Sequence, residues 1–106
     1  MKNRDLILAA ADLIEGEGRW TQGYTARNEY GQPVSNGHME AVCWCAIGAL
    51  RRVSGEENLE NIVAVKLGLN CSPIGKPHPL AAFNDAEKRS QSEVVSALRR
   101  AAELVD

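Results

Sequence analysis

The stretch Ala41–Leu50, which reads AVCWCAIGAL, constrains the fold most because the whole run carries no charged residue. Apolar and small residues recur through it and beyond it at helical rather than strand spacing, at Val42, Cys43, Ala46, Leu50 and Val53. This spacing predicts a helix over 40–53. A helix that is apolar nearly all round is typical of a central helix that packs on several sides.

Gly48 and the two cysteines of this run favour a core role over a reactive one. On a helix over 40–53, Cys43 lies on the core-facing stripe, whereas Cys45 lies on the opposite face with Gly48. Glycine costs about 1 kcal/mol relative to alanine inside a helix, and close approach of another backbone would offset that cost. Buried cysteine behaves as a small hydrophobe. We therefore expect another backbone segment to pack against the Cys45 face.

Three further helices are predicted over 4–15, 55–67 and 91–105. The first begins near Asn3 as its N-cap and ends before Gly16. Capping boxes at Ser54–Glu57 and Ser90–Glu93 are expected to open the other two, and Gly68 is placed to close the helix over 55–67. The segment LAAFNDAE, residues 80–87, could add one helical turn. The sequence predicts an all-α fold, a single compact domain of residues 1–106 with four helices.

Composition excludes several classes of function. The net charge of −2 and the pI of about 5.7 disfavour nucleic acid as a partner. No apolar run reaches the roughly 20 residues that span a bilayer, and the N-terminal segment lacks a signal-peptide cleavage site. The odd number of cysteines fits no disulfide framework. We expect a cytoplasmic protein with reduced thiols, no membrane contact and no cofactor.

The long segment from Gly16 to Gly37 is the first candidate binding region. It joins the first two predicted helices, and long ordered loops in small domains are often functional. It carries aromatic and arginine side chains, the types enriched at interface hot spots, at Trp20, Tyr24, Arg27 and Tyr30. We expect either recognition of a protein or small-molecule partner through these side chains or packing of the same side chains over the core.

A cysteine nucleophile is the alternative function. Cys45 would attack, His78 would act as the base, and Asn84 or Asp85 would orient the imidazole, in the chain order of papain-like amidases. An attacking thiolate needs a lowered pKa, whereas Cys45 is expected about a turn inside a helix. His78 stands between two prolines, as exposed loop residues do, and Asn84 with Asp85 could instead form an Asx turn or a cap.

A metal site is the third reading, drawn from residues of the kinds that bind zinc: His38, Cys43, Cys45, Cys71 and His78. Structural zinc sites use four ligands that converge tetrahedrally. A Cys-x-Cys pair on a helix would direct its two sulfurs apart, so the spacing argues against a bound metal.

Four motifs together carry a family resemblance. They are Trp20-Thr21-Gln22, then Gly31-Gln32-Pro33-Val34, then AVCWCAIGAL, and finally Asn84-Asp85 followed by Glu93-Val94. The chain resembles a family of small uncharacterised bacterial and phage proteins, a domain of unknown function frequent in actinobacteria. An aromatic residue, usually Trp, precedes the Asn-Asp pair in that family, and Phe83 stands there in this chain.

The resemblance implies which residues matter and brings no established activity. It marks Cys45 and the pair Asn84-Asp85 as the family's hallmark, and the Trp-x-Gln motif adds Gln22 to the candidate binding residues. We therefore expect a non-catalytic binding protein, such as an accessory or inhibitory protein of a phage or mobile element. Its expected binding residues are Trp20, Gln22, Tyr24, Arg27, Tyr30, Asn84 and Asp85.

Overall fold

The computed structural model describes residues 2–55, 58–69 and 78–105. The described residues form five helices and a small three-stranded antiparallel sheet. In chain order, the elements are α1 (Asn3–Glu15), β1 (Ala26–Arg27), β2 (Pro33–Val34), β3 (Cys43–Trp44), α2 (Ala46–Ser54), α3 (Leu59–Lys66), α4 (Pro79–Asp85) and α5 (Gln91–Leu104). The prediction of an all-α fold with four helices is therefore wrong, and the fold is α+β.

Irregular backbone and the two-residue strand β3 replace the first part of the predicted helix over 40–53. Arg27 of β1 pairs with Cys43, and Ala26 pairs with Trp44. The Cys45 amide donates to the Thr25 carbonyl at 3.2 Å, so this residue also continues the pairing before α2 begins. Backbone partners distant in the sequence thus override the local helical spacing, which cannot register such partners.

Helix α3 also begins later than predicted. Gly55 has φ of 71° and caps the C-terminus of α2, so the expected capping box at Ser54 does not open the next helix. Residues 56 and 57 lie outside the described residues, and α3 begins at Leu59 after Asn58. Gly68 has φ of 70° and closes α3 as predicted. The left-handed backbone at both helix ends favours glycine, which has no Cβ to clash there.

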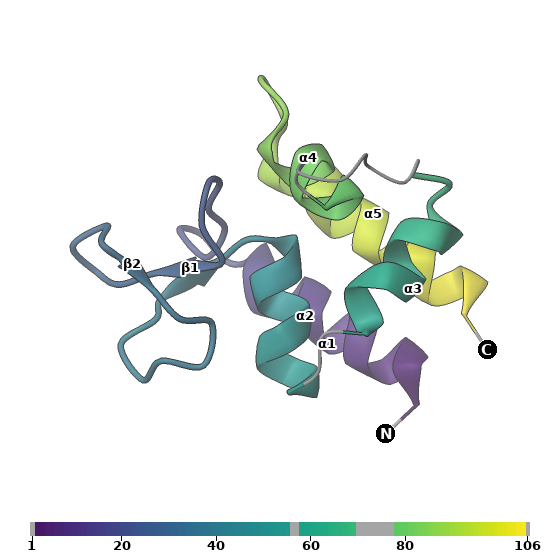
Figure 1. Cartoon of the computed structure of the whole chain (residues 1–106), viewed down its shortest axis with the longest axis horizontal. Coiled ribbons are helices and arrows are strands. Elements are labelled where there is room, and N and C mark those ends of the chain that lie inside the picture. The colour runs from purple at the N-terminus through teal and green to yellow at the C-terminus, as the bar shows by residue number, and fades with distance from the viewer. Residues whose placement is uncertain (1, 56–57, 70–77, 106) are drawn as a thin grey trace.

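The core lies around α2, as the uncharged run indicates. Helix α2 packs against α1, α3 and α4, and α1 packs along α5 (Figure 1). The largest side chains with almost no exposure come from every helix of this group: Ile7, Ile14, Leu50, Val63, Leu80, Val94 and Leu98. The predicted capping box at Ser90 and Glu93 is present at the start of α5. The two terminal helices agree closely with the prediction because their signals are local.

Residues 19–44 form a separate structural layer that we call the β lobe. Its strands lie in the order β2-β1-β3, with Ala26 opposite both Val34 and Trp44. Figure 1 shows the β lobe extending to one side of the helices, while both chain termini lie on the other side. The long aromatic segment is therefore ordered and attached to the core at its base.

Candidate functional site

Asn84 on α4 connects the β lobe to the helices. Its side chain is fully buried. Its Oδ1 accepts hydrogen bonds from the indole Nε1 of Trp20 at 2.8 Å and from the Ala46 amide at 3.0 Å. Its Nδ2 donates to the Thr21 carbonyl at 3.1 Å and to Asp85 Oδ1 at 2.9 Å. These four bonds occupy the whole capacity of the amide, so Asn84 has no donor or acceptor left to orient an imidazole.

Gln22 and Asp85 complete this connection. The Gln22 Nε2 donates to the Asn84 carbonyl at 2.9 Å and to the Ala86 carbonyl at 3.2 Å, where the last turn of α4 lacks helical partners. The Gly23 amide donates to Asp85 Oδ1 at 3.0 Å. Three predicted binding residues, Trp20, Gln22 and Asn84, are thus engaged inside the protein.

Cys45 is the N-cap of α2 and does not lie inside the helix as expected. Its Sγ accepts a hydrogen bond from the Gly48 amide at 3.3 Å, and 6% of the residue is exposed. Burial raises the pKa of the Cys45 thiol and outweighs the hydrogen bonds from the helix amides, which act in the opposite direction. The thiol is therefore protonated at neutral pH and is a poor nucleophile.

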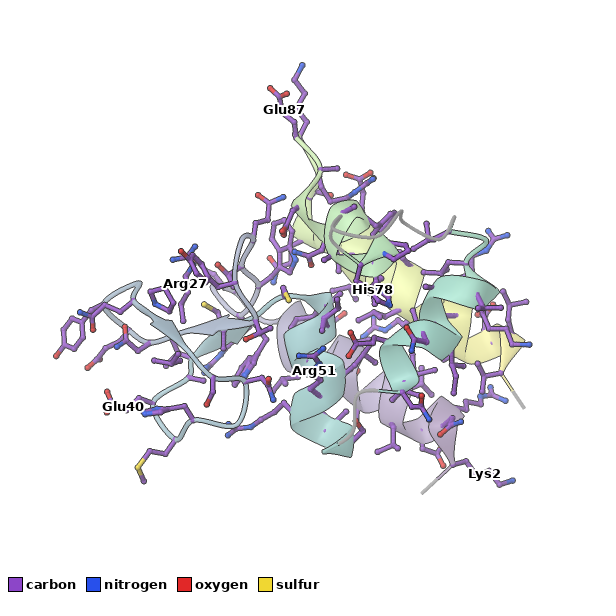
Figure 2. The ribbon with its side chains drawn as sticks, in the orientation of Figure 1. Lys2, Arg27, Glu40, Arg51, His78 and Glu87 are labelled. Atoms are coloured by element: carbon purple, nitrogen blue, oxygen red, sulfur yellow. The ribbon has the colours of Figure 1, made fainter. Side chains whose placement is uncertain are left out.

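A small cavity of about 200 Å³ lies at the junction of the β lobe with α2, α3 and α4. Figure 2 shows Arg51 and His78 on the side of α2 that faces α3. The lining includes three of the predicted site residues, Cys45, His78 and Asp85, together with Gly23, Tyr24, Thr25, Ile47, Arg51, Glu60 and Ala81. The fold thus brings the predicted cysteine, histidine and aspartate to one cavity, whereas Asn84 is committed to the contacts of Trp20 and Ala46.

His78 is the N-cap of α4, and both of its ring nitrogens are engaged. Nδ1 accepts from the Leu80 amide at 3.1 Å, and Nε2 lies 2.7 Å from Asn61 Oδ1. Because an amide oxygen only accepts, Nε2 carries the proton and the ring is neutral. No lone pair of His78 is left to take a proton from Cys45 in this arrangement.

We expect slow alkylation of Cys45, because a raised pKa means less thiolate. In a variant with Cys43→Ser and Cys71→Ser, iodoacetamide at neutral pH should label Cys45 more slowly than it labels free cysteine. Unfolding the same variant in urea should restore the free-thiol rate. Labelling of the folded variant faster than free cysteine would contradict the assignment of Cys45 as a capping residue and would support a nucleophile.

The predicted aromatic residues of the long segment differ in how far they are exposed. Trp20 is half-buried, whereas Tyr24 is 54% exposed and Tyr30 is 76% exposed. Arg27 lies over the Tyr24 ring at 4.7 Å and donates to three groups within the β lobe, on Thr21, Gln22 and Gly31. Arg27 therefore stiffens the β lobe and holds Tyr24 in place.

Three residues that hold these regions together were not predicted from the sequence. Asn28 is 7% exposed, and its Oδ1 accepts from the amides of Tyr30 and Gln32. Arg52 on α2 donates to two carbonyls of residues 36 and 38 and lies over the Trp44 ring. Glu60 is 4% exposed and pairs with Arg51. The Asn-x-Tyr-Gly composition could have indicated the turn at Asn28, whereas the other two contacts leave no local signal.

The candidate metal ligands lie in different parts of the fold. His38 and Cys43 belong to the β lobe, where His38 Nδ1 accepts from the Glu40 amide. Cys71 lies outside the described residues. Within residues 2–55, 58–69 and 78–105, no three side chains of His, Cys, Asp or Glu come together in a group that could hold a metal ion.

Comparison with known proteins gives a family and no assigned activity. Residues 1–104 match the model of a family of unknown function (DUF6197), which confirms the resemblance to an uncharacterised domain family. No curated protein and no solved structure matches the chain. In the part of the chain that the structure describes, no helix is long and apolar enough to cross a membrane.

Proposed function

The chain belongs to this family of unknown function, and we propose that it is a non-catalytic recognition module that binds a partner protein through the outer face of its β lobe. The outer face is defined by the two most exposed large apolar side chains of the β lobe, Tyr30 and Met39. We further propose that it acts in the cytoplasm of a bacterial cell, as an accessory or inhibitory protein of a phage or mobile element. The reduced Cys43 and Cys45 support a reducing compartment.

The observation that carries the proposal is the distribution of exposed apolar side chains. Five large ones are exposed among the described residues. Two of them, Tyr30 and Met39, define the outer face, and Tyr24, also in the β lobe, lines the cavity at its base. Met39 is 89% exposed, so these side chains contribute little to the core. Tyrosine and methionine are enriched at protein interfaces, so exposed side chains of these two types are the contacts we propose.

The internal bonding of the β lobe supports the same proposal. Asn28, Arg27 and Arg52 fix the loops through hydrogen bonds within the chain itself. A binding surface that is ordered before the partner arrives loses less conformational entropy on binding. The Tyr30 amide donates to Asn28 Oδ1, so the backbone that carries the Tyr30 ring is held in place.

A cysteine-dependent hydrolase remains the second candidate, because Cys45, His78 and Asp85 line one cavity. Two observations favour recognition over it. Burial keeps the Cys45 thiol protonated, and both nitrogens of His78 already have partners.

A photo-crosslinking experiment tests the proposal. A benzoylphenylalanine at position 30 should give a discrete crosslinked product in a lysate of cells that carry the gene. The matched control has the same group at position 65, because Val65 on α3 is also exposed (73%) and lies outside the β lobe. A product from position 30 that is absent from position 65 is expected. No product from position 30, or the same product from both, would contradict recognition through the β lobe.

A further inference from the structure

Among the described residues that line the cavity beside Cys45, one carboxylate has no ion-pair partner. Glu60 on its wall is 4% exposed, and its two oxygens accept from the Arg51 guanidinium at 2.7 and 3.1 Å, so that pair is neutral. His78 is neutral through its two hydrogen bonds, and the Cys45 thiol is protonated. Asp85 is then the one uncompensated charge among the described residues that line the cavity.

Asp85 is held so that part of its carboxylate stays available. Its Oδ1 accepts from the Gly23 amide and from Asn84 Nδ2. Oδ2 has no hydrogen-bond partner among the described residues, and Asp85 is an exposed residue that lines the cavity. Asp85 is also the last residue of α4, whose terminal carbonyls already accept from Gln22 and Arg89. A cation at Oδ2 would balance the charge of the carboxylate.

The helix N-terminus at the cavity does not favour an anion instead. The amide of Ala46 donates to Asn84 Oδ1, and the amide of Gly48 donates to Cys45 Sγ. An anionic ligand would therefore find these donors already occupied, while it would face the carboxylate of Asp85.

The remaining walls fit a short apolar stem. Ile47 and Ala81 supply apolar surface, and Tyr24 supplies an aromatic ring. This ring already holds the Arg27 guanidinium at 4.7 Å, so Tyr24 supplies apolar surface and the counter-charge comes from Asp85. A volume of about 200 Å³ equals that of about seven water molecules at roughly 30 Å³ each, which suits a small ligand with a short stem.

We infer that this cavity binds a small organic cation, a guanidinium or primary ammonium on a short apolar stem, with Asp85 as its counter-ion. The inference does not depend on the protein partner of the β lobe. Such a cation could be a free small molecule or the side chain of an arginine or lysine residue, and the chemistry recognised is the same.

Four probes that each carry a chain of four carbon atoms test the inference on the wild-type protein by NMR titration of the backbone amides. n-Butylguanidinium and n-butylammonium should give saturable shifts at Gly23, Thr25 and Cys45, with affinity in roughly the millimolar range. Butyrate and n-butanol should not. Equal binding of butyrate or n-butanol, or no saturable shift with either cation, would overturn the inference.

A charge substitution tests the counter-ion. Asp85→Asn keeps the Oδ1 acceptor for the Gly23 amide and should weaken n-butylguanidinium binding roughly tenfold. Glu87→Gln is the matched control, because Figure 2 shows Glu87 pointing away from the cavity, and it should bind as the wild type does. Wild-type binding by Asp85→Asn would overturn the role of Asp85, and the four-probe comparison stands even if this variant does not fold.

The source of the cation is distinguished by a fifth probe, N-acetyl-arginine-N-methylamide, which mimics an arginine within a protein. Binding of this probe at the same amides supports a partner side chain. Binding of n-butylguanidinium alone supports a free small molecule. Either result supports the cation site, and neither depends on crosslinking from position 30.

Discussion

Gly48→Ala is expected to lower the free energy of unfolding by about 3 kcal/mol, at the upper end of the usual cost of overpacking. A Cβ at this position would lie 1.9 Å from the carbonyl oxygen of Thr25 and 2.7 Å from its carbonyl carbon. Thr25 cannot move away freely, because its carbonyl accepts from the Cys45 amide. The larger Gly48→Leu should be at least as destabilising. Urea unfolding measures the change.

Gly37→Ala is the matched control for Gly48. No atom lies within 4 Å of a Cβ built at Gly37, and its φ is not positive. This variant should stay within about 0.5 kcal/mol of the wild type, as surface substitutions usually do. If Gly48→Ala unfolded at the same urea concentration as Gly37→Ala, the close contact between α2 and the β lobe would be wrong.

Asn84→Ala is expected to cost about 4 kcal/mol, because it leaves several buried polar groups without partners. The indole of Trp20, the amide of Ala46 and the carbonyl of Thr21 each lose a hydrogen bond from a fully buried side chain. Each unsatisfied buried group costs about 1–3 kcal/mol, and water that enters the site recovers part of this sum. Urea unfolding of the purified variant gives the value.

Asn58→Ala is the comparison for this truncation, since Asn58 is exposed and its side chain makes no capping hydrogen bond to α3. It should change the free energy of unfolding by less than about 0.5 kcal/mol. A cost for Asn84→Ala as small as that for Asn58→Ala would mean that Asn84 does not hold the β lobe to α4. In that case Asn84 would return as a candidate site residue.

Two elements and one contact could be predicted from the sequence because their causes are local. Helix α1 follows from its apolar spacing and its end before Gly16, and α5 follows from the box at Ser90 and Glu93. Gly48 predicted a close backbone approach, which the Thr25 carbonyl makes. Gly48 indicated this contact because glycine destabilises a helix interior, and a close contact offsets that cost.

The strands could not be predicted because nothing near them in the sequence specifies them. Each strand has two residues, too short to show alternation. The Cys43–Trp44 strand depends on partners at Arg27 and Arg19, which are distant in the sequence. The spacing of its apolar residues alone therefore predicted the start of a helix. Because α2 begins later than predicted, Cys45 is its N-cap, and the thiol accepts a hydrogen bond from the Gly48 amide.

The arrangement of the candidate site depended on equally distant contacts. Asn84 reaches Trp20 and Thr21 across more than sixty positions of the chain. Residue types alone could group Cys45, His78 and Asp85 as candidates, and they do line one cavity. They could not show that Asn84 is buried with every hydrogen-bonding position occupied.

The most direct test of recognition through the β lobe is the affinity of Tyr30→Ala for the protein that crosslinks at position 30. Tyr30 is 76% exposed, so its truncation should leave the urea midpoint unchanged. Calorimetric titration should show affinity roughly tenfold or more below that of the wild type, as the loss of an aromatic hot spot does. Val65→Ala should bind as the wild type does. Wild-type affinity in the folded Tyr30→Ala variant would contradict the proposed function.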